Sequence, residues 1–227
     1  MENEKYKKLE AVIGYKFKDK GLLDIAFTHK SYINETICKR GESYERFEFL
    51  GDAILEFLVS DFLFREYPDK TEGELTKFRA SLVCEFTLCK LARQLSLGDY
   101  GYFSKGERLT GGRDRDSILC DMFESVLGAL FLDGGLEPAK AFVYKFLLND
   151  IEHKQLFSDS KTKLQEYAQK NGVTLRYETL NEDGPEHNKQ FAVQVYIGDK
   201  AFSKGIGHSR KAAEQQAAYE SLKQLLK

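Results

Sequence analysis

Acidic residues recur through an otherwise apolar stretch of the sequence, ERFEFLGDAILEFLV (residues 45–59). On a helix with 100° per residue, four of them fall within roughly 80° of one another: Glu45, Glu48, Asp52 and Glu56. The other positions are nearly all apolar, so we expect this helix to be buried. Because uncompensated buried carboxylates cost several kcal/mol, the acids must face solvent or a cation.

A second apolar segment, SILCDMFESVLGALFLDGG (residues 117–135), carries two internal acids. Asp121 and Glu124 are spaced i, i+3 on one side, next to Ser125 and Gly128, which are small enough for another helix to pack closely. Packing of the two helices through these faces would bring four carboxylates together: Glu48, Asp52, Asp121 and Glu124. Such oxygen donors, without imidazole or thiolate, favour Mg²⁺ or Mn²⁺.

A hard-cation site of this kind supports phosphodiester hydrolysis. The cation lowers the pKa of a coordinated water and stabilises in-line displacement at phosphorus. The four histidines are scattered and offer no pair for metal-free cleavage through a 2′-hydroxyl. Glu45 and Glu56, at the two ends of the acidic stripe, have the simpler explanation of a solvated rim.

The amino-acid composition indicates the general class of protein. The chain has 227 residues, a net charge of −2 and 42% hydrophobic residues, which is typical of a soluble globular protein. No stretch approaches about 18 apolar residues and the first ten residues are rich in charged side chains, so we expect a cytoplasmic location. The four cysteines form no CxxC pair, which argues against zinc and favours reduced, mostly buried thiols.

The apolar periodicity up to about residue 151 is helical and predicts an all-α domain. Turn signals separate six expected helices, over residues 4–12, 20–28, 42–66, 73–97, 114–132 and 137–153. The polar segment HKQLFSDS then predicts a short linker. We therefore expect a catalytic domain over 1–153, a linker over 154–159 and a second domain over 160–227.

The second domain has a different pattern. SKTKLQEYAQKNG predicts a helix that ends at Gly172, and a final alanine-rich helix has Ser209 as its N-cap. Between them, VTLRYETL, QFAVQVYI and KAFSKGIG alternate as strands do, with a tight turn at Gly198–Asp199. The order α-β-β-β-α predicts a small α+β domain.

This domain has features of a nucleic-acid reader. Arg210 and Lys211 lie in the first turn of the last helix, where cations are unfavourable by about 0.3–1 kcal/mol each unless an anion binds there. With Gly205 and Gly207 before it, this helix start predicts a phosphate site. Further polar groups, without an aromatic platform, favour double-stranded over single-stranded RNA: Thr162, Gln165, Glu166 and His187.

Taken together, the motifs resemble those of the ribonuclease III family, whose signature is ERLEFLGD. The matching segments span nearly the whole chain: FTHKSYINE, ERFEFLGDAILEF, EGELTKFRASLV, KGERLTGGRDRDSILCDMFESVLGALFLD, KTKLQEY, GPEHNKQF and GIGHSRKAAEQQAA. The resemblance implies an all-α endonuclease domain followed by a double-stranded-RNA-binding domain. It also implies a homodimer, with no membrane and no small-molecule cofactor, that cleaves both RNA strands with Mg²⁺, for which Mn²⁺ could substitute.

The family's products would carry 5′-phosphate and 3′-hydroxyl ends with two-nucleotide 3′ overhangs, and its expected role is processing of ribosomal RNA precursors and structured transcripts. By resemblance, Glu48, Asp121 and Glu124 are the metal ligands, and Asp52 and Glu124 are the catalytic acids; the residues themselves add Asp52 to the metal site. Glu45 and Glu72 match acids that meet RNA or a second metal, and Phe49 matches a dimer anchor. The matches to RNA-contacting positions are Thr162, Gln165, Glu166, His187, Ser209, Arg210 and Lys211.

Two alternatives stay open. One is a catalytically silent member that only binds double-stranded RNA, although all four key acids are present. The other is a helical enzyme that uses carboxylate-bound magnesium on a small diphosphate, but the sequence lacks a DDxxD run and the C-terminal domain would be unexplained. Departures from the family pattern are small: Phe47 replaces leucine, Cys120 stands where alanine is common, and Glu56 has no acidic counterpart.

Overall fold

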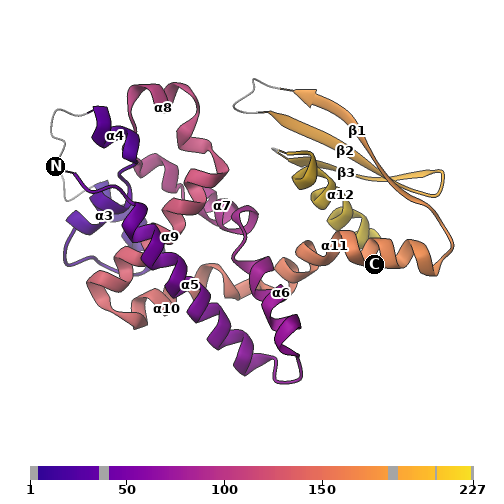
Figure 1. Ribbon diagram of the computed structural model, residues 1–227, viewed down its shortest axis with the longest axis horizontal. Helices are drawn as coiled ribbons and strands as arrows, with labels where there is room; N and C mark the ends of the chain where they lie inside the picture. Colours follow the sequence, from indigo (N-terminus) through magenta and orange to yellow (C-terminus); the bar gives the residue numbers. More distant parts are fainter. Residues whose placement is uncertain (1–4, 36–40, 184–188, 208, 226–227) are drawn as a thin grey trace. The chain divides into compact units, whose positions relative to one another are not determined.

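The computed structural model describes residues 5–35, 41–183, 189–207 and 209–225 (Figure 1). The chain divides into two compact units, Met1–Ile151 and Glu152–Lys227. In its described part the first unit is helical, apart from one isolated bridge between Thr28 and Tyr102. The second unit contains a three-stranded sheet and helices. The fold class expected from the sequence is confirmed.

The helices of the first unit are α2 (Lys7–Ile13), α3 (Gly21–Ala26), α4 (Lys30–Glu35), α5 (Glu45–Glu66), α6 (Glu72–Leu82), α7 (Glu85–Gln94), α8 (Lys105–Leu109), α9 (Asp116–Gly134) and α10 (Leu136–Phe146). Three 3₁₀ turns join them, Leu97–Tyr100, Gly112–Asp114 and Leu148–Asp150. The sequence did not predict α4 and α8, which are too short to show an apolar period. No described helix has the length and apolar character needed to span a bilayer.

The packing of α5 against α9 forms the centre of the first unit (Figure 1). A Cβ atom on Gly51 would lie 1.8 Å from the carbonyl oxygen of Glu124, and one on Gly128 would lie 2.4 Å from that of Phe47. The two backbones therefore touch, and only glycine fits at the crossing. Gly128 has the role that the sequence predicted, whereas Ser125 donates its hydroxyl to a carbonyl at the end of α3.

The expectation that α5 is buried all round is wrong for one face. The side chains of Phe49, Phe57 and Phe64 are 80%, 57% and 73% exposed, while the opposite face, including Leu55 and Val59, lies fully in the core. Helix α5 therefore has more apolar side chains than the rest of this chain buries. Three exposed phenylalanines on one helix are more than a monomeric surface ordinarily shows.

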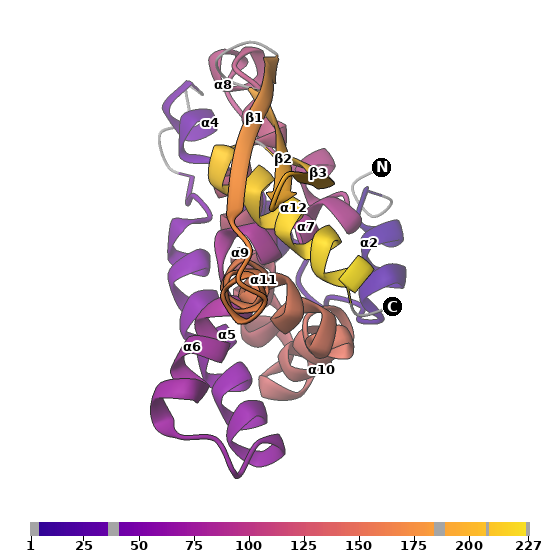
Figure 2. The same ribbon diagram turned by 90° about the vertical axis from the view of Figure 1, so that its right-hand side faces the viewer.

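The single helix predicted over 73–97 is also wrong, because α6 and α7 are separate. Cys84 between them has an extended backbone, with φ −73° and ψ 152°. The carbonyl of Ser81, which a continuing helix would use, accepts bonds from the side chains of Cys84 and Thr87 instead. A capping box of Thr71 and Glu74 begins α6, which runs beside the C-terminal half of α5 (Figure 2).

The second unit contains α11 (Ile151–Lys170, its first residue in the first unit), β1 (Leu175–Asp183), β2 (Gln190–Ile197), β3 (Lys200–Gly207) and α12 (Arg210–Leu225). The helix predicted to start at Ser160 is wrong, because α11 runs through the polar residues 154–159 where the sequence predicted a linker. Polarity does not break a helix, and this segment contains neither glycine nor proline. The Ser160 hydroxyl also donates to the carbonyl of Phe157, one turn back, and caps nothing.

The sheet of the second unit has the antiparallel order β1-β2-β3. Its core joins Leu164 of α11, Val195 of β2 and Ala217 of α12, so both helices cover one face (Figure 1). The predicted turn is present, with Gly198 at φ +59°. The predicted N-cap is confirmed, since the Ser209 hydroxyl accepts a bond of 3.1 Å from the third residue of α12.

Candidate metal centre and nucleic-acid interface

Three carboxylates from distant parts of the sequence meet where α5 crosses α9. One oxygen from each of Glu48, Asp121 and Glu124 lies within 4.8 Å of the others, and all three residues are half-buried. Among the residues that the structure describes, no other group of three or more His, Cys, Asp or Glu side chains comes this close. The sequence predicted four acids at this place; Asp52 is not one of the three and is exposed.

The charges of this carboxylate cluster, Glu48, Asp121 and Glu124, oppose one another. Burial and the nearby charge of Asp121 raise the pKa of Glu48 to about 7. Burial and the charges of Asp52 and Glu48 raise the pKa of Glu124 to about 8. Burial also raises the pKa of Asp121. Removing these groups from water beside like charges therefore favours their protonated forms.

This donor set fits a hard divalent cation. Mg²⁺ and Mn²⁺ prefer carboxylate oxygens, and a bound cation would compensate the repulsion that raises the pKa values. The close backbone approach at Gly51 and Gly128 brings α5 and α9 near enough for carboxylates from both helices to come within 4.8 Å of one another. Glu48, Asp121 and Glu124 are therefore the residues that could hold it.

Two further acids of α5 lie around the carboxylate cluster. Asp52 is close enough for its charge to raise the pKa of Glu124, while burial and the charge of Glu56 raise the pKa of Asp52 itself. Glu45 is exposed and bonds to Lys30 Nζ at 3.1 Å and to the Ser43 hydroxyl at 3.0 Å, which lowers its pKa. Glu45 therefore lies exposed at the edge of the carboxylate cluster, and Lys30 compensates its charge.

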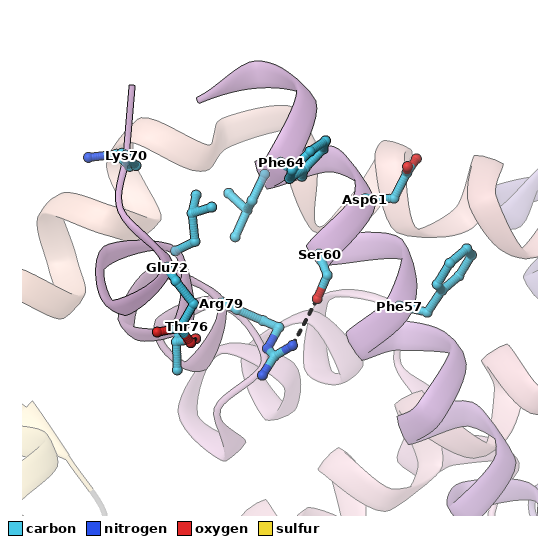
Figure 3. A pocket seen from close by; sticks show the side chains of 10 residues that line it. Phe57, Ser60, Asp61, Phe64, Lys70, Glu72, Thr76 and Arg79 are labelled. Atoms are coloured by element: carbon cyan, nitrogen blue, oxygen red, sulfur yellow. Dashed lines mark hydrogen bonds between the residues drawn. The ribbon is translucent and has the colours of Figure 1, made fainter. Parts of the chain in front are cut away.

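The last predicted acid of this region, Glu72, begins α6 and is exposed. It lies apart from the carboxylate cluster, beside a pocket of about 690 Å³ between α5 and α6 (Figure 3). Phe57 and Phe64 also line this pocket, and Arg79 in its wall donates to the Ser60 hydroxyl at 2.9 Å. The structure therefore separates Glu72 from the candidate metal centre within this chain.

Sequence reasoning missed Tyr44, whose hydroxyl donates to Asp121 Oδ2 at 3.0 Å. Tyr44 lies four residues before Glu48, one helical turn away, and this spacing was the available signal. It also missed Lys30, which bonds to Glu45 and whose charge lowers the pKa of Glu48 and Asp121. Lys30 lies within FTHKSYINE, a segment used only for its resemblance.

The raised pKa values predict a pH-dependent stability in EDTA. Between the unfolded value of 4.5 and the folded values of about 7 and 8, native Glu48 and Glu124 hold protons that the unfolded chain has released. Their protonation therefore stabilises the fold at low pH, and this contribution is lost as the pH rises from the unfolded value through the folded values. We expect the Tm to fall between about pH 5 and about pH 8 and to level off above it, as thermal denaturation would show.

The Glu124→Gln variant is the control, since it removes one titrating group; its Tm should fall less over the same pH range. Mg²⁺ should raise the wild-type Tm more at about pH 9 than at about pH 7, because the carboxylates are then ionised. A wild-type Tm that rises across this range, or a variant with the wild-type slope, would contradict the raised pKa values.

In the second unit the structure places most predicted RNA-contacting residues on the surface. Thr162, Gln165 and Glu166 are exposed on α11 at spacings that share one edge of the helix. Ser209, Arg210 and Lys211 are exposed at the start of α12. His187 lies outside the described residues, so its position stays a prediction.

The first turn of α12 is less cationic than the sequence suggested. Arg210 Nε lies 3.0 Å from one oxygen of Glu214, and Lys161 Nζ lies 2.6 Å from the other. Lys211 has no such ion pair among the described residues. The glycines before this turn serve packing, because Cβ atoms on Gly205 and Gly207 would lie 2.2 and 2.6 Å from backbone atoms of α12.

Both units of the chain match models of known protein families. Residues 19–151 match the family model described as ribonuclease-III-like, and residues 160–225 match the double-stranded RNA binding motif. The chain is 46% identical to Ribonuclease 3 of Bacillus velezensis over 228 residues, which cover 99% of this chain and 91% of the relative. It is also 46% identical to Ribonuclease 3 of Bacillus cereus, over 98% of this chain and 92% of that protein.

The first unit also resembles solved structures. Two structures of the nuclease domain of ribonuclease III from Campylobacter jejuni match with TM-scores of 0.59. They are 41% and 40% identical to this chain and cover 64% and 65% of it, and 97% and 96% of their own chains. The first of them is described as flexible in a region involved in dimer formation of that domain.

Proposed function

The chain belongs to the ribonuclease III family, and we propose that it is a magnesium-dependent endoribonuclease that cuts both strands of double-stranded RNA as a homodimer. One observation carries this proposal: Glu48, Asp121 and Glu124 converge in a chain that also carries a double-stranded RNA binding motif. A site for hard cations, in a chain that binds duplex RNA through another domain, supports hydrolysis at phosphorus. Because the relatives are bacterial Ribonuclease 3 proteins, we also propose a cytoplasmic location.

The chemistry divides between the cation and the side chains. A divalent cation, when bound, activates water as a nucleophile and stabilises the charge that develops on the phosphate. Glu48, Asp121 and Glu124 would hold and orient it. Asp52, exposed beside Glu124, would orient the attacking water by accepting a hydrogen bond. Attack in line breaks the P–O3′ bond, which leaves a 5′-phosphate and a 3′-hydroxyl.

A cleavage assay tests this proposal. Duplex RNA labelled at one end is incubated with the full-length protein in Mg²⁺, in Mn²⁺ and in EDTA, and the product ends are mapped. We expect cuts on both strands with short 3′ overhangs in Mg²⁺ or Mn²⁺, and none in EDTA. Tight binding to the duplex without any cut in either metal would instead identify a silent RNA-binding protein.

The exposed face of α5 supports the homodimer. Phe49, Phe57 and Phe64 are exposed on this helix, and a second copy is the partner we assign to them, because duplex RNA has two strands to be cut by two equal sites. The nuclease domain of Campylobacter jejuni ribonuclease III, similar to this unit, forms dimers according to its description.

We expect Phe49→Glu to weaken the dimer. A central aromatic anchor contributes about 2 kcal/mol or more to an interface, so the dimer Kd should rise by about 30-fold or more. Sedimentation equilibrium at several protein concentrations measures this change. Leu109→Glu is the matched control, because Leu109 is 73% exposed, close to the 80% of Phe49, but lies on α8. Equal dimer Kd values for the two variants would rule out the α5 face as the interface.

The first turn of α12 supports RNA binding through Lys211. We expect Lys211→Ala to weaken duplex binding for all sequences alike and to lower the slope of log K against log salt by about 1, as loss of one phosphate contact does. Binding is measured in EDTA at several salt concentrations. Lys223→Ala, in the last turn of α12, should leave the slope unchanged. An unchanged slope for Lys211→Ala would remove Lys211 from the interface.

A further inference from the structure

Tyr44 connects the two helices that carry the carboxylate cluster. Its hydroxyl donates to Asp121 Oδ2 of α9 at 3.0 Å. Its carbonyl accepts the backbone N–H of Glu48 in the first turn of α5 at 2.8 Å. One residue therefore contacts a candidate ligand on each helix. The hydroxyl bond goes to Oδ2 of Asp121, and the carboxylate keeps lone pairs with which it could also bind a cation.

Packing and hydrogen bonds hold Tyr44 in place. Its side chain is only 3% exposed, and its backbone N–H donates to the carbonyl of Thr28 at 2.9 Å. The ring of His29 lies 5.7 Å from the Tyr44 ring and 5.8 Å from the Phe103 ring. The Ser31 backbone N–H donates to His29 Nδ1, which orients the imidazole. The hydroxyl of Tyr44 therefore reaches Asp121 from a rigid support.

We propose that Tyr44 is a positioning residue for the metal centre: its hydroxyl orients the Asp121 carboxylate toward the cation that Glu48 and Glu124 share with it. This inference rests on the proposed function and adds a residue to that site. Groups that orient metal ligands commonly change metal affinity or activity by 10- to 100-fold when they are lost. A phenol suits this position, because it donates one hydrogen bond and adds no charge to the carboxylate cluster.

The test compares metal binding by full-length Tyr44→Phe and wild-type protein, without RNA. Phenylalanine keeps the ring contact with His29 and removes only the hydroxyl. By calorimetric titration with Mn²⁺, we expect the Kd to rise about tenfold or more. The Mg²⁺ concentration for half-maximal cleavage should rise in parallel, and much of the lost rate should return at saturating Mg²⁺. Duplex binding in EDTA should be unchanged.

Tyr15→Phe is the matched control. The Tyr15 hydroxyl donates to Asp133 Oδ2 at 2.7 Å, so this variant loses a tyrosine–aspartate bond to the same helix, α9, three turns from Asp121. Its Mn²⁺ affinity should equal that of the wild type, whatever the change in Tm. Replacement of Tyr44 by 4-aminophenylalanine restores a hydrogen-bond donor at the end of the ring and should recover the Mn²⁺ affinity of the wild type.

The outcomes separate the two proposals. Wild-type protein that neither binds Mn²⁺ nor cleaves RNA contradicts the proposed function. Wild-type protein that does both, with unchanged Mn²⁺ affinity in Tyr44→Phe, overturns the role of Tyr44 alone. If Tyr44→Phe does not unfold cooperatively, the variant with 4-aminophenylalanine at position 44 decides the question. Weak Mn²⁺ binding by that variant in its folded state also overturns the positioning role. A Mn²⁺ affinity equal to that of the wild type supports it.

Discussion

Glu124→Gln is expected to lower magnesium-dependent cleavage of duplex RNA by about 10³-fold or more, a loss of at least about 4 kcal/mol of transition-state stabilisation. Glu124 is the acid on which burial and the charges of Asp52, Glu48 and Asp121 act together, and its pKa of about 8 reflects their combined effect. Glutamine keeps the shape of the side chain but removes the negative charge that would hold a divalent cation. Single-turnover cleavage rates at saturating RNA measure the loss.

The fold and RNA binding should survive this change. Removing one charge from a repelling cluster should leave the Tm in EDTA at about pH 8 equal to or above that of the wild type. Duplex affinity in EDTA should be unaltered, since the binding motif lies in residues 160–225. Glu137→Gln, an exposed acid in the first turn of α10, is the control and should cleave normally. Activity near the wild-type level in Glu124→Gln would refute the site assignment.

Gly51→Ala is expected to destabilise the first unit by more than about 3 kcal/mol, at or beyond the upper end of ordinary overpacking effects. The added methyl group would lie 1.8 Å from the carbonyl oxygen of Glu124, a backbone atom with no rotamer to move. To relieve this contact, α5 and α9 must separate at the point where Glu48 faces Asp121 and Glu124. Both stability and metal binding should therefore decline. Chemical denaturation and Mn²⁺ titration measure the two effects.

Gly73→Ala provides a control with the same substitution. Gly73 lies in the first turn of α6, and a Cβ atom there meets no atom within 4 Å. Alanine favours the helix by up to about 1 kcal/mol relative to glycine, so this variant should be as stable as the wild type or slightly more stable. If Gly51→Ala proves as stable as Gly73→Ala, the close crossing of α5 and α9 is incorrect.

The sequence alone was sufficient for the fold class and for much of the metal centre. Helical periodicity placed Glu48 on one apolar segment and Asp121 with Glu124 on another, and buried charges require compensation wherever they occur. Gly128 marked the face through which the second segment packs. Strand alternation, the turn at Gly198 and the cap at Ser209 are local signals as well, so the order of the C-terminal elements followed from short stretches of chain.

The tertiary structure decided what depends on contacts between distant residues. The distances within the carboxylate cluster, the exclusion of Asp52 from it and the link from Tyr44 to Asp121 arise only when α5 meets α9. Helix ends also depend on partners: α6 stops because two side chains bond to the Ser81 carbonyl, and α11 continues through polar residues because nothing breaks it.

The same division explains α5, the helix that carries the acidic stripe. Its periodicity identified an apolar helix, but periodicity cannot tell which apolar face the chain's own core will cover. Only the packing of α9 and its neighbours shows that Leu55 is buried while Phe49 remains exposed. The sequence determined which side chains each helix offers, because those depend on spacing along the chain. The tertiary structure decided which of them meet, because burial and mutual charge depend on neighbours that are distant in sequence.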